Sequence, residues 1–337
     1  MTEHVLTEGR FGSSAEILRA ATPAFVEAGT SVEVAGSFAV HPLLDSWVWD
    51  SRRAEMPIPI DSQLLLPVEG DPFTTERWFS QTHPMDAALI DELSVVISRE
   101  LDVVAVVETP SAEFGALITE ADVILQSVLP CLWPTLKPFV TRVYDMRSER
   151  SNSATFDNIG GAVLLSSAML VHNERRQEQI VALAECLLHE AAHSKSYRLF
   201  RSFSRMVVPQ SPDFIDIPWW RTANSGWAWD IDRSIVACHV YAHLSVFYQR
   251  LAPAEPIVRR RGAACAFRAA YLANVLLQLD DVWLDPDWRA FIEWVRCAIP
   301  AIPNLTATGR EALSREITDF EAYPALMEAQ KRLASLR

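Results

Sequence analysis

A long amphipathic segment at residues 180–200 constrains the fold of this chain of 337 residues most strongly, because its periodicity predicts one long helix. The segment contains the H-E-x-x-H sequence His189-Glu190-Ala191-Ala192-His193. Positions i and i+4 of an α-helix lie one above the other on the same face. We therefore expect His189 and His193 to reach one metal ion and Glu190 to act beside it.

The spacing of apolar residues along the rest of the chain predicts a mainly helical α+β protein with short strands. We expect a zincin-like metal helix that packs on a second helix bearing histidines, at residues 232–251. Residues 86–108 predict either a helix followed by a strand or one long helix. Further helices are expected at residues 13–28, 116–132, 136–146, 259–279, 286–298 and 310–336, and strands at 32–40, 62–68 and 162–167.

Polar residues at 148–158 predict a loop that divides the chain. The division would leave a mixed or helical region at residues 1–150, which we expect to recognise substrate, and a catalytic metal-binding region at residues 151–337. A single continuous domain is the alternative. Proline, aspartate and tryptophan at residues 207–229 predict an irregular segment.

Charge and hydropathy exclude several classes of protein. A formal net charge of −13 argues against a nucleic-acid partner, because binding to phosphates requires a basic surface. No apolar run of 18 residues and no signal peptide are evident, so we expect no membrane span and a cytoplasmic location. The five cysteines are scattered, as in proteins of a reducing compartment.

A metal site needs at least a third protein ligand. His239 and His243 are also spaced i, i+4, and either could complete the site. The alternative for His243 is that it packs between helices or supports a metal ligand by hydrogen bonding. The usual metallopeptidase ligands are missing, because Ser196 and Leu199 replace the glycine and third histidine of a metzincin. No glutamate follows Glu190 until Glu255, beyond the second helix. Histidine is therefore the best third ligand that the sequence offers.

Cationic side chains close to the motif indicate a second binding function. Lys195, Arg221 and Arg233 lie near the two histidine pairs in the sequence. Arginine forms paired hydrogen bonds to carboxylates and lysine supplies a point charge, so these residues suit a dicarboxylate co-substrate. A peptidase does not need such a cluster.

The stretches GGAVLLSS, LLHEAAHSK, PWWR and DRSIVACHVYAHLSVFY resemble the α-ketoglutarate-dependent HExxH-type peptide β-hydroxylases, over residues 158–250. The resemblance implies an Fe(II) oxygenase that uses O2 and 2-oxoglutarate to hydroxylate an amino-acid side chain, at the β-carbon, in a peptide or related substrate of natural product biosynthesis. It implies His189, His193 and His239 as iron ligands, and Lys195, Arg221 and Arg233 as candidates for binding 2-oxoglutarate. Between Arg221 and Arg233 the chain departs from the family pattern, which puts Arg221 in most doubt.

Two other functions remain open from the residues. One is a zinc metallopeptidase with Glu190 as general base; the other is a non-catalytic binding protein with a vestigial motif, which would bind no metal. In an oxygenase, Glu190 would instead form hydrogen bonds to groups that bind the metal, or act as a minor ligand. The tryptophans between the two metal helices either line a substrate pocket or anchor the irregular segment: Trp219, Trp220, Trp227 and Trp229.

Overall fold

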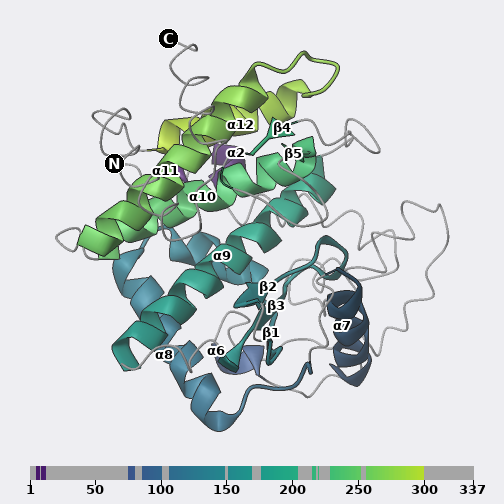
Figure 1. Ribbon diagram of the computed structural model, residues 1–337, viewed down its shortest axis with the longest axis vertical. Coiled ribbons are helices and arrows are strands. Elements are labelled where there is room, and N and C mark those ends of the chain that lie inside the picture. Colours follow the sequence, from purple (N-terminus) through teal and green to yellow (C-terminus); the bar gives the residue numbers. More distant parts are fainter. Residues whose placement is uncertain are drawn as a thin grey trace. The chain divides into compact units, whose positions relative to one another are not determined.

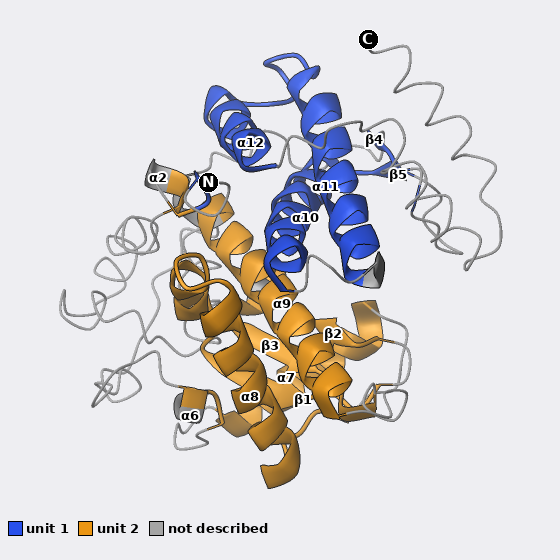
Figure 2. Ribbon diagram, turned by 90° about the vertical axis from the view of Figure 1, so that its left-hand side faces the viewer, with its two compact units in different colours: residues 1–6, 205–337 blue, residues 7–204 orange. Residues whose placement is uncertain are grey.

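The computed structural model describes residues 5–7, 9–12, 75–79, 86–100, 106–148, 151–168, 176–203, 215–217, 219, 228–251 and 256–299. Within these ranges the chain is mainly helical with a few short strands, which confirms the predicted fold class at that level (Figure 1). The chain divides into two compact units (Figure 2). Unit 1 comprises residues 1–6 and 205–337, and unit 2 comprises residues 7–204.

Unit 2 is built around a three-stranded sheet of order β1-β3-β2. Strand β1 (Arg142–Asp145) runs parallel to β3 (Ala162–Leu165), and β2 (Ser153–Ala154) pairs with β3 in antiparallel register, with Ser153 opposite Leu165. Its helical elements are α2 (Gly9–Gly12), α6 (Thr75–Trp78), α7 (Asp86–Glu100), α8 (Ala112–Val128), α9 (Arg176–Phe203) and the 3-10 turns Trp133–Thr135, Lys137–Phe139 and Asp157–Ile159.

Helix α9 is the central helix of this unit. It packs against α8 and against strands β2 and β3. All four residues of β3 are buried, as expected for a continuous apolar strand that is covered on both faces. Helix α7 lies on the other side of the sheet (Figure 1), where Asp86 forms an ion pair of 3.3 Å with Arg142 of β1. The H-E-x-x-H sequence is thus held on a helix that is packed on two sides.

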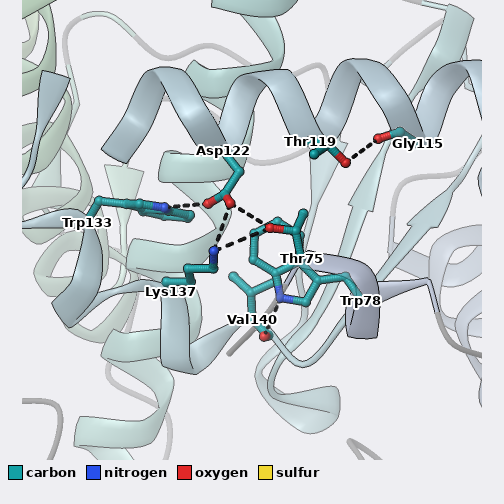
Figure 3. Close-up of polar contacts among 8 residues, drawn as sticks. All are labelled: Thr75, Trp78, Gly115, Thr119, Asp122, Trp133, Lys137 and Val140. Atoms are coloured by element: carbon teal, nitrogen blue, oxygen red, sulfur yellow. Dashed lines mark hydrogen bonds and ion pairs between the residues drawn. The ribbon is translucent and has the colours of Figure 1, made fainter. Parts of the chain in front are cut away.

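A buried polar cluster joins the short helical elements of unit 2 to α8 (Figure 3). The carboxylate of Asp122 accepts hydrogen bonds from the hydroxyl of Thr75 at 2.6 Å and the indole of Trp133 at 2.7 Å. The ammonium of Lys137 lies 2.7 Å from the same carboxylate and 5.3 Å from the ring centroid of Trp78. Because the charge is paired and every donor has an acceptor, this burial is tolerated.

The prediction of a helix at residues 136–146 is wrong. Lys137–Phe139 form a 3-10 turn, and the chain then extends as β1. The residues that follow Pro138 find their backbone partners next to Gly161 and in β3, which favours extended chain over a helix. The division of the chain predicted at residue 150 stays a prediction; the described strands β1 and β2, which precede and follow that residue in the sequence, both pair with β3.

The structure confirms other local predictions for unit 2. The helix at 180–200 and the strand near residue 162 are confirmed as α9 and β3. Asp86–Glu100 form helix α7, and Glu108 pairs with Asp145 in an isolated bridge, so one helix over all of residues 86–108 is excluded. Residues 101–105 lie outside the described residues. The loop predicted at 148–158 contains the two residues of β2.

The described residues of unit 1 form a two-stranded antiparallel ribbon and three helices that pack on one another. Asp230 caps the first of these helices, since its carboxylate accepts from the backbone N–H of Arg233 at 2.6 Å. The sequence predicted all three helices, and the ribbon lies within the segment expected to be irregular. The elements are β4 (Ile215–Asp216), β5 (Ala228–Trp229), α10 (Ile231–Leu251), α11 (Pro256–Leu277) and α12 (Pro286–Ala298).

Some predicted elements fall outside the described residues: the helices at 13–28 and 310–336 and the strands at 32–40 and 62–68. Of the helices that the structure describes, none alone has the length and apolar character needed to cross a membrane. One bent pair, α8 with Trp133–Phe139, meets that criterion by length and composition only.

Candidate metal centre on helix α9

The two motif histidines come together on one face of α9. Their Nε2 atoms lie 3.0 Å apart, and the ring centroids are 4.8 Å apart with a tilt of 41°. This is the arrangement that the i, i+4 spacing predicted. Both rings are only partly buried, so a solute can reach them.

The distance between the two Nε2 atoms can be compared with the distance between two nitrogen ligands of one metal ion. For metal–nitrogen bonds of about 2.1 Å, neighbouring nitrogens lie about 3.0 Å apart around an octahedral ion and about 3.4 Å apart around a tetrahedral one. The observed 3.0 Å therefore fits two adjacent positions of an octahedral ion. It equally fits an N–H···N hydrogen bond between two neutral rings.

Tyr197 continues the same face of the helix. Its hydroxyl lies 3.3 Å from Nδ1 of His193, and the two rings are 5.7 Å apart. The nitrogen of His193 that faces away from His189 thus has a polar partner. Such a contact to the second ring nitrogen is usual for histidines that bind metals.

Glu190 points toward the sheet and lies beside the histidines. Its carboxylate accepts a hydrogen bond of 2.6 Å from the hydroxyl of Ser153 in β2, and its Oε1 is 4.0 Å from Nε2 of His189. Burial raises the pKa of Glu190 to about 8, while the hydrogen bond from Ser153 opposes that shift. A cation held by the histidines would favour the charged carboxylate and lower this pKa again.

Desolvation lowers the pKa of His189 from its usual value. The desolvation is partial, because 36 % of the side chain is still exposed to solvent. The ring is therefore neutral at pH 7, which is the form that a metal requires of an imidazole.

Lys195 lies on a different face of α9. It follows His193 by two residues, which places it about 200° around the helix from that histidine. Its side chain is fully buried, and its ammonium donates a hydrogen bond of 3.0 Å to the carbonyl of Gly12 in α2. Burial lowers the pKa of Lys195 to about 7. Unit 2 therefore does not bring Lys195 together with the motif histidines, and its binding of 2-oxoglutarate stays a prediction.

The second histidine pair is buried inside unit 1. Nδ1 of His243 donates a hydrogen bond of 2.8 Å to the backbone carbonyl of His239, which leaves Nε2 of His243 as the nitrogen able to bind a cation. The ring of His239 contacts the aromatic rings of Phe291 and Trp294 in α12, at centroid distances of 5.4 and 6.1 Å.

Of the four candidate pocket tryptophans, the two that the structure describes, Trp219 and Trp229, are packing residues of unit 1. The indole of Trp219 donates to the hydroxyl of Tyr241 at 3.2 Å, and its ring lies against Tyr271. The exposed guanidinium of Arg233 covers the buried ring of Trp229 at 4.7 Å. Arg221, Trp220 and Trp227 lie outside the described residues.

Among the residues that the structure describes, no group of three or more His, Cys, Asp or Glu side chains is assembled as a metal site. His189 and His193 belong to unit 2 and His239 belongs to unit 1. The set of three histidine ligands therefore stays a prediction.

Comparison of the chain with known proteins adds no family assignment. No model of a protein family matches the sequence, and no curated protein matches it either. The resemblance to peptide β-hydroxylases thus stays a prediction that rests on the quoted motifs.

Two residues of the site were not singled out from the sequence. Tyr197 could have been found, because it continues the i, i+4 spacing of the two histidines. Ser153 could not, because it lies 37 residues before Glu190 and meets it only through the packing of β2 on α9.

Proposed function

We propose that helix α9 carries an Fe(II) centre and that the protein is a 2-oxoglutarate-dependent oxygenase. Its reaction is hydroxylation of an amino-acid side chain, at the β-carbon, in a peptide or a related substrate. The observation that carries this proposal is the pairing of His189 and His193 on one partly exposed face of α9, where the 3.0 Å between their Nε2 atoms is compatible with two adjacent positions of an octahedral ion.

His189 and His193 would hold the iron through Nε2, with His239 as the third ligand. Bound iron and 2-oxoglutarate supply the oxidising chemistry: O2 and 2-oxoglutarate are consumed, succinate and CO2 are released, and one C–H bond of the substrate becomes C–OH. The chain binds and orients the reactants. Arg233 or Arg221 would bind the distal carboxylate of 2-oxoglutarate, and Lys195 is the remaining candidate.

Glu190 would act by hydrogen bonding in this reaction. Its carboxyl group is held by Ser153 at 2.6 Å and lies 4.0 Å from Nε2 of His189. From there it can accept a hydrogen bond from a group that binds beside His189. No proton transfer by Glu190 is required for hydroxylation.

The test is anaerobic loading of the metal-free protein with Fe(II), followed by 2-oxoglutarate and then O2. We expect the visible absorption band of iron-chelated 2-oxoglutarate, then release of succinate. His189→Ala and His193→Ala should lose both signals. Glu178→Gln, a change at an exposed residue in the first turn of α9, is the control and should keep both. An iron-loaded protein that shows neither signal would contradict the proposal.

A zinc metallopeptidase is the second candidate, and the position of Glu190 supports it. Its carboxyl group lies 4.0 Å from Nε2 of His189, and a metal held there would favour the charged carboxylate, the form that can take a proton from an attacking water. This function predicts peptide cleavage by the zinc-loaded protein, loss of cleavage in Glu190→Gln, and no succinate. A non-catalytic binding protein predicts that neither metal is retained.

A further inference from the structure

Three side chains form a continuous stripe on α9: His189, His193 and Tyr197. The rings of His189 and His193 are 4.8 Å apart, and those of His193 and Tyr197 are 5.7 Å apart. His193 stands in the middle, with Nε2 facing His189 at 3.0 Å and Nδ1 facing the hydroxyl of Tyr197 at 3.3 Å. Both nitrogens of one ring are therefore engaged along the stripe.

A neutral imidazole has one nitrogen that donates and one that accepts. The partner of Nδ1 therefore controls what Nε2 can do. If Nδ1–H donates to the oxygen of Tyr197, Nε2 keeps its lone pair, which can accept from Nε2–H of His189 or bind a cation. If the Tyr197 hydroxyl donates to Nδ1 instead, the proton lies on Nε2 and that nitrogen cannot bind a metal.

We infer that Tyr197 is a positioning residue of the metal centre, whose phenolic oxygen accepts the Nδ1 proton of His193 and so directs the Nε2 lone pair toward His189. This inference rests on the proposed metal centre of α9. The two histidines are different tautomers in the metal-free protein: His193 carries its proton on Nδ1, and His189 carries its proton on Nε2. Metal binding then requires a change of tautomer in His189 alone.

The first test is the affinity of the metal-free protein for Co(II), measured by titration at one fixed pH. Tyr197→Phe keeps the ring in the stripe and removes the oxygen. We expect its Kd for Co(II) to rise by about 10-fold to 100-fold, the usual effect of losing such a partner. Tyr241→Phe removes the hydroxyl of another partly buried tyrosine, which accepts from Trp219, and is the matched control. Its Kd should equal that of the wild type.

The second test is the tautomer of His193, read from long-range proton–nitrogen NMR correlations of the metal-free wild type. The His193 signals are assigned by their loss in His193→Gln. We expect the proton on Nδ1 in the wild type and on Nε2 in Tyr197→Phe, because Nε2–H is the favoured tautomer of an imidazole without an acceptor at Nδ1. A change of packing alone would not move the proton between the two nitrogens.

The outcomes separate this inference from the proposed function. Weak Co(II) binding by Tyr197→Phe, with no succinate from the iron-loaded wild type, would support the positioning role and contradict the oxygenase. Succinate release together with equal Co(II) affinities would support the oxygenase and overturn the role of Tyr197. A proton on Nε2 of His193 in the wild type, or a wild type that binds no metal, would also overturn it.

Discussion

At the scale of single residues, the buried groups of α9 differ in how their cost of burial is offset. The carboxyl group of Glu190 receives a hydrogen bond from Ser153, whereas the ammonium of Lys195 donates to a neutral backbone carbonyl. A neutral acceptor only partly compensates the loss of hydration of a charge. We therefore expect the burial of Lys195 to affect the free energy of unfolding of the protein.

We predict a pH-dependent contribution of Lys195 to stability. Its pKa is about 7 in the folded state and about 10.5 when unfolded, so between these values the unfolded chain binds more protons. The free energy of unfolding should then rise as the pH increases from 7 toward 10.5. Lys195→Met removes the titrating group, and its free energy of unfolding should rise less over this range.

Urea unfolding of the metal-free protein at several pH values measures this difference. Below pH 7 the lysine is protonated in both states, so the difference between wild type and Lys195→Met should become constant. Equal pH profiles from pH 7 to 10 would show that the ammonium is not buried as described.

At the scale of elements, unit 2 depends on residues that join segments distant in the sequence. Gly161 precedes β3 with a φ of 89°, and its carbonyl accepts from the backbone N–H of Thr141 at 2.9 Å. Asp122 holds α6 and both turns after α8 through its hydrogen bonds (Figure 3). Replacement of Gly161 or of Asp122 should therefore lower the stability of unit 2 by a measurable amount.

Gly161→Ala should destabilise unit 2 by about 2 kcal/mol, because a side chain at positive φ is strained. The new Cβ would also lie 2.7 Å from the hydroxyl oxygen of Thr141 and 3.3 Å from the carbonyl of Phe139. The control is Gly115→Ala inside α8, where the nearest atom to a Cβ is 3.9 Å away. That change should stabilise by up to about 1 kcal/mol through helix propensity. Equal shifts of the urea midpoint in the two variants would contradict the strain at Gly161.

Asp122→Ala should cost about 3 kcal/mol, because it leaves the indole of Trp133, the hydroxyl of Thr75 and a charged Lys137 without their acceptor. Asp91→Ala, at an exposed position of α7, is the control and should change stability by less than about 0.5 kcal/mol. Thermal unfolding followed by circular dichroism compares the two. A loss in Asp122→Ala no larger than that of the control would show that the cluster is not held as described.

At the scale of the whole molecule, the two histidine pairs belong to different compact units. A metal that binds only the folded protein stabilises it by mass action. With Fe(II) or Co(II) at about 100 times Kd, we expect a gain of about 2.7 kcal/mol and a higher Tm, reversed by a chelator. His189→Ala should show no such gain. An unchanged wild-type Tm with saturating metal would contradict a metal centre.

The third ligand can be identified by the same titration. We predict that His239→Ala loses iron affinity and that His243→Ala retains more of it. The reverse result would assign the ligand to His243, whose Nδ1 is already engaged by the carbonyl of His239 at 2.8 Å, while the oxygenase function could still stand. Iron content after gel filtration measures both variants against the wild type.

The sequence by itself determined the features that depend on local periodicity. Helices α9, α10 and α12 follow from repeating apolar positions, and the approach of His189 to His193 follows from the i, i+4 geometry of one helix. The strand β3 could be predicted because a short apolar run after two glycines has few other solutions.

Only the tertiary structure decided the features that join distant segments. The extension of residues 142–145 as β1 depends on backbone partners in β3, whereas the apolar pattern of residues 136–146 had predicted a helix there. The same holds for the partners of the site: Ser153 for Glu190 and Gly12 for Lys195, which are 37 and 183 residues apart in sequence. Such contacts arise from packing between elements, which no local pattern in the sequence records. The sequence therefore located the histidine pair, and the fold decided which side chains surround it.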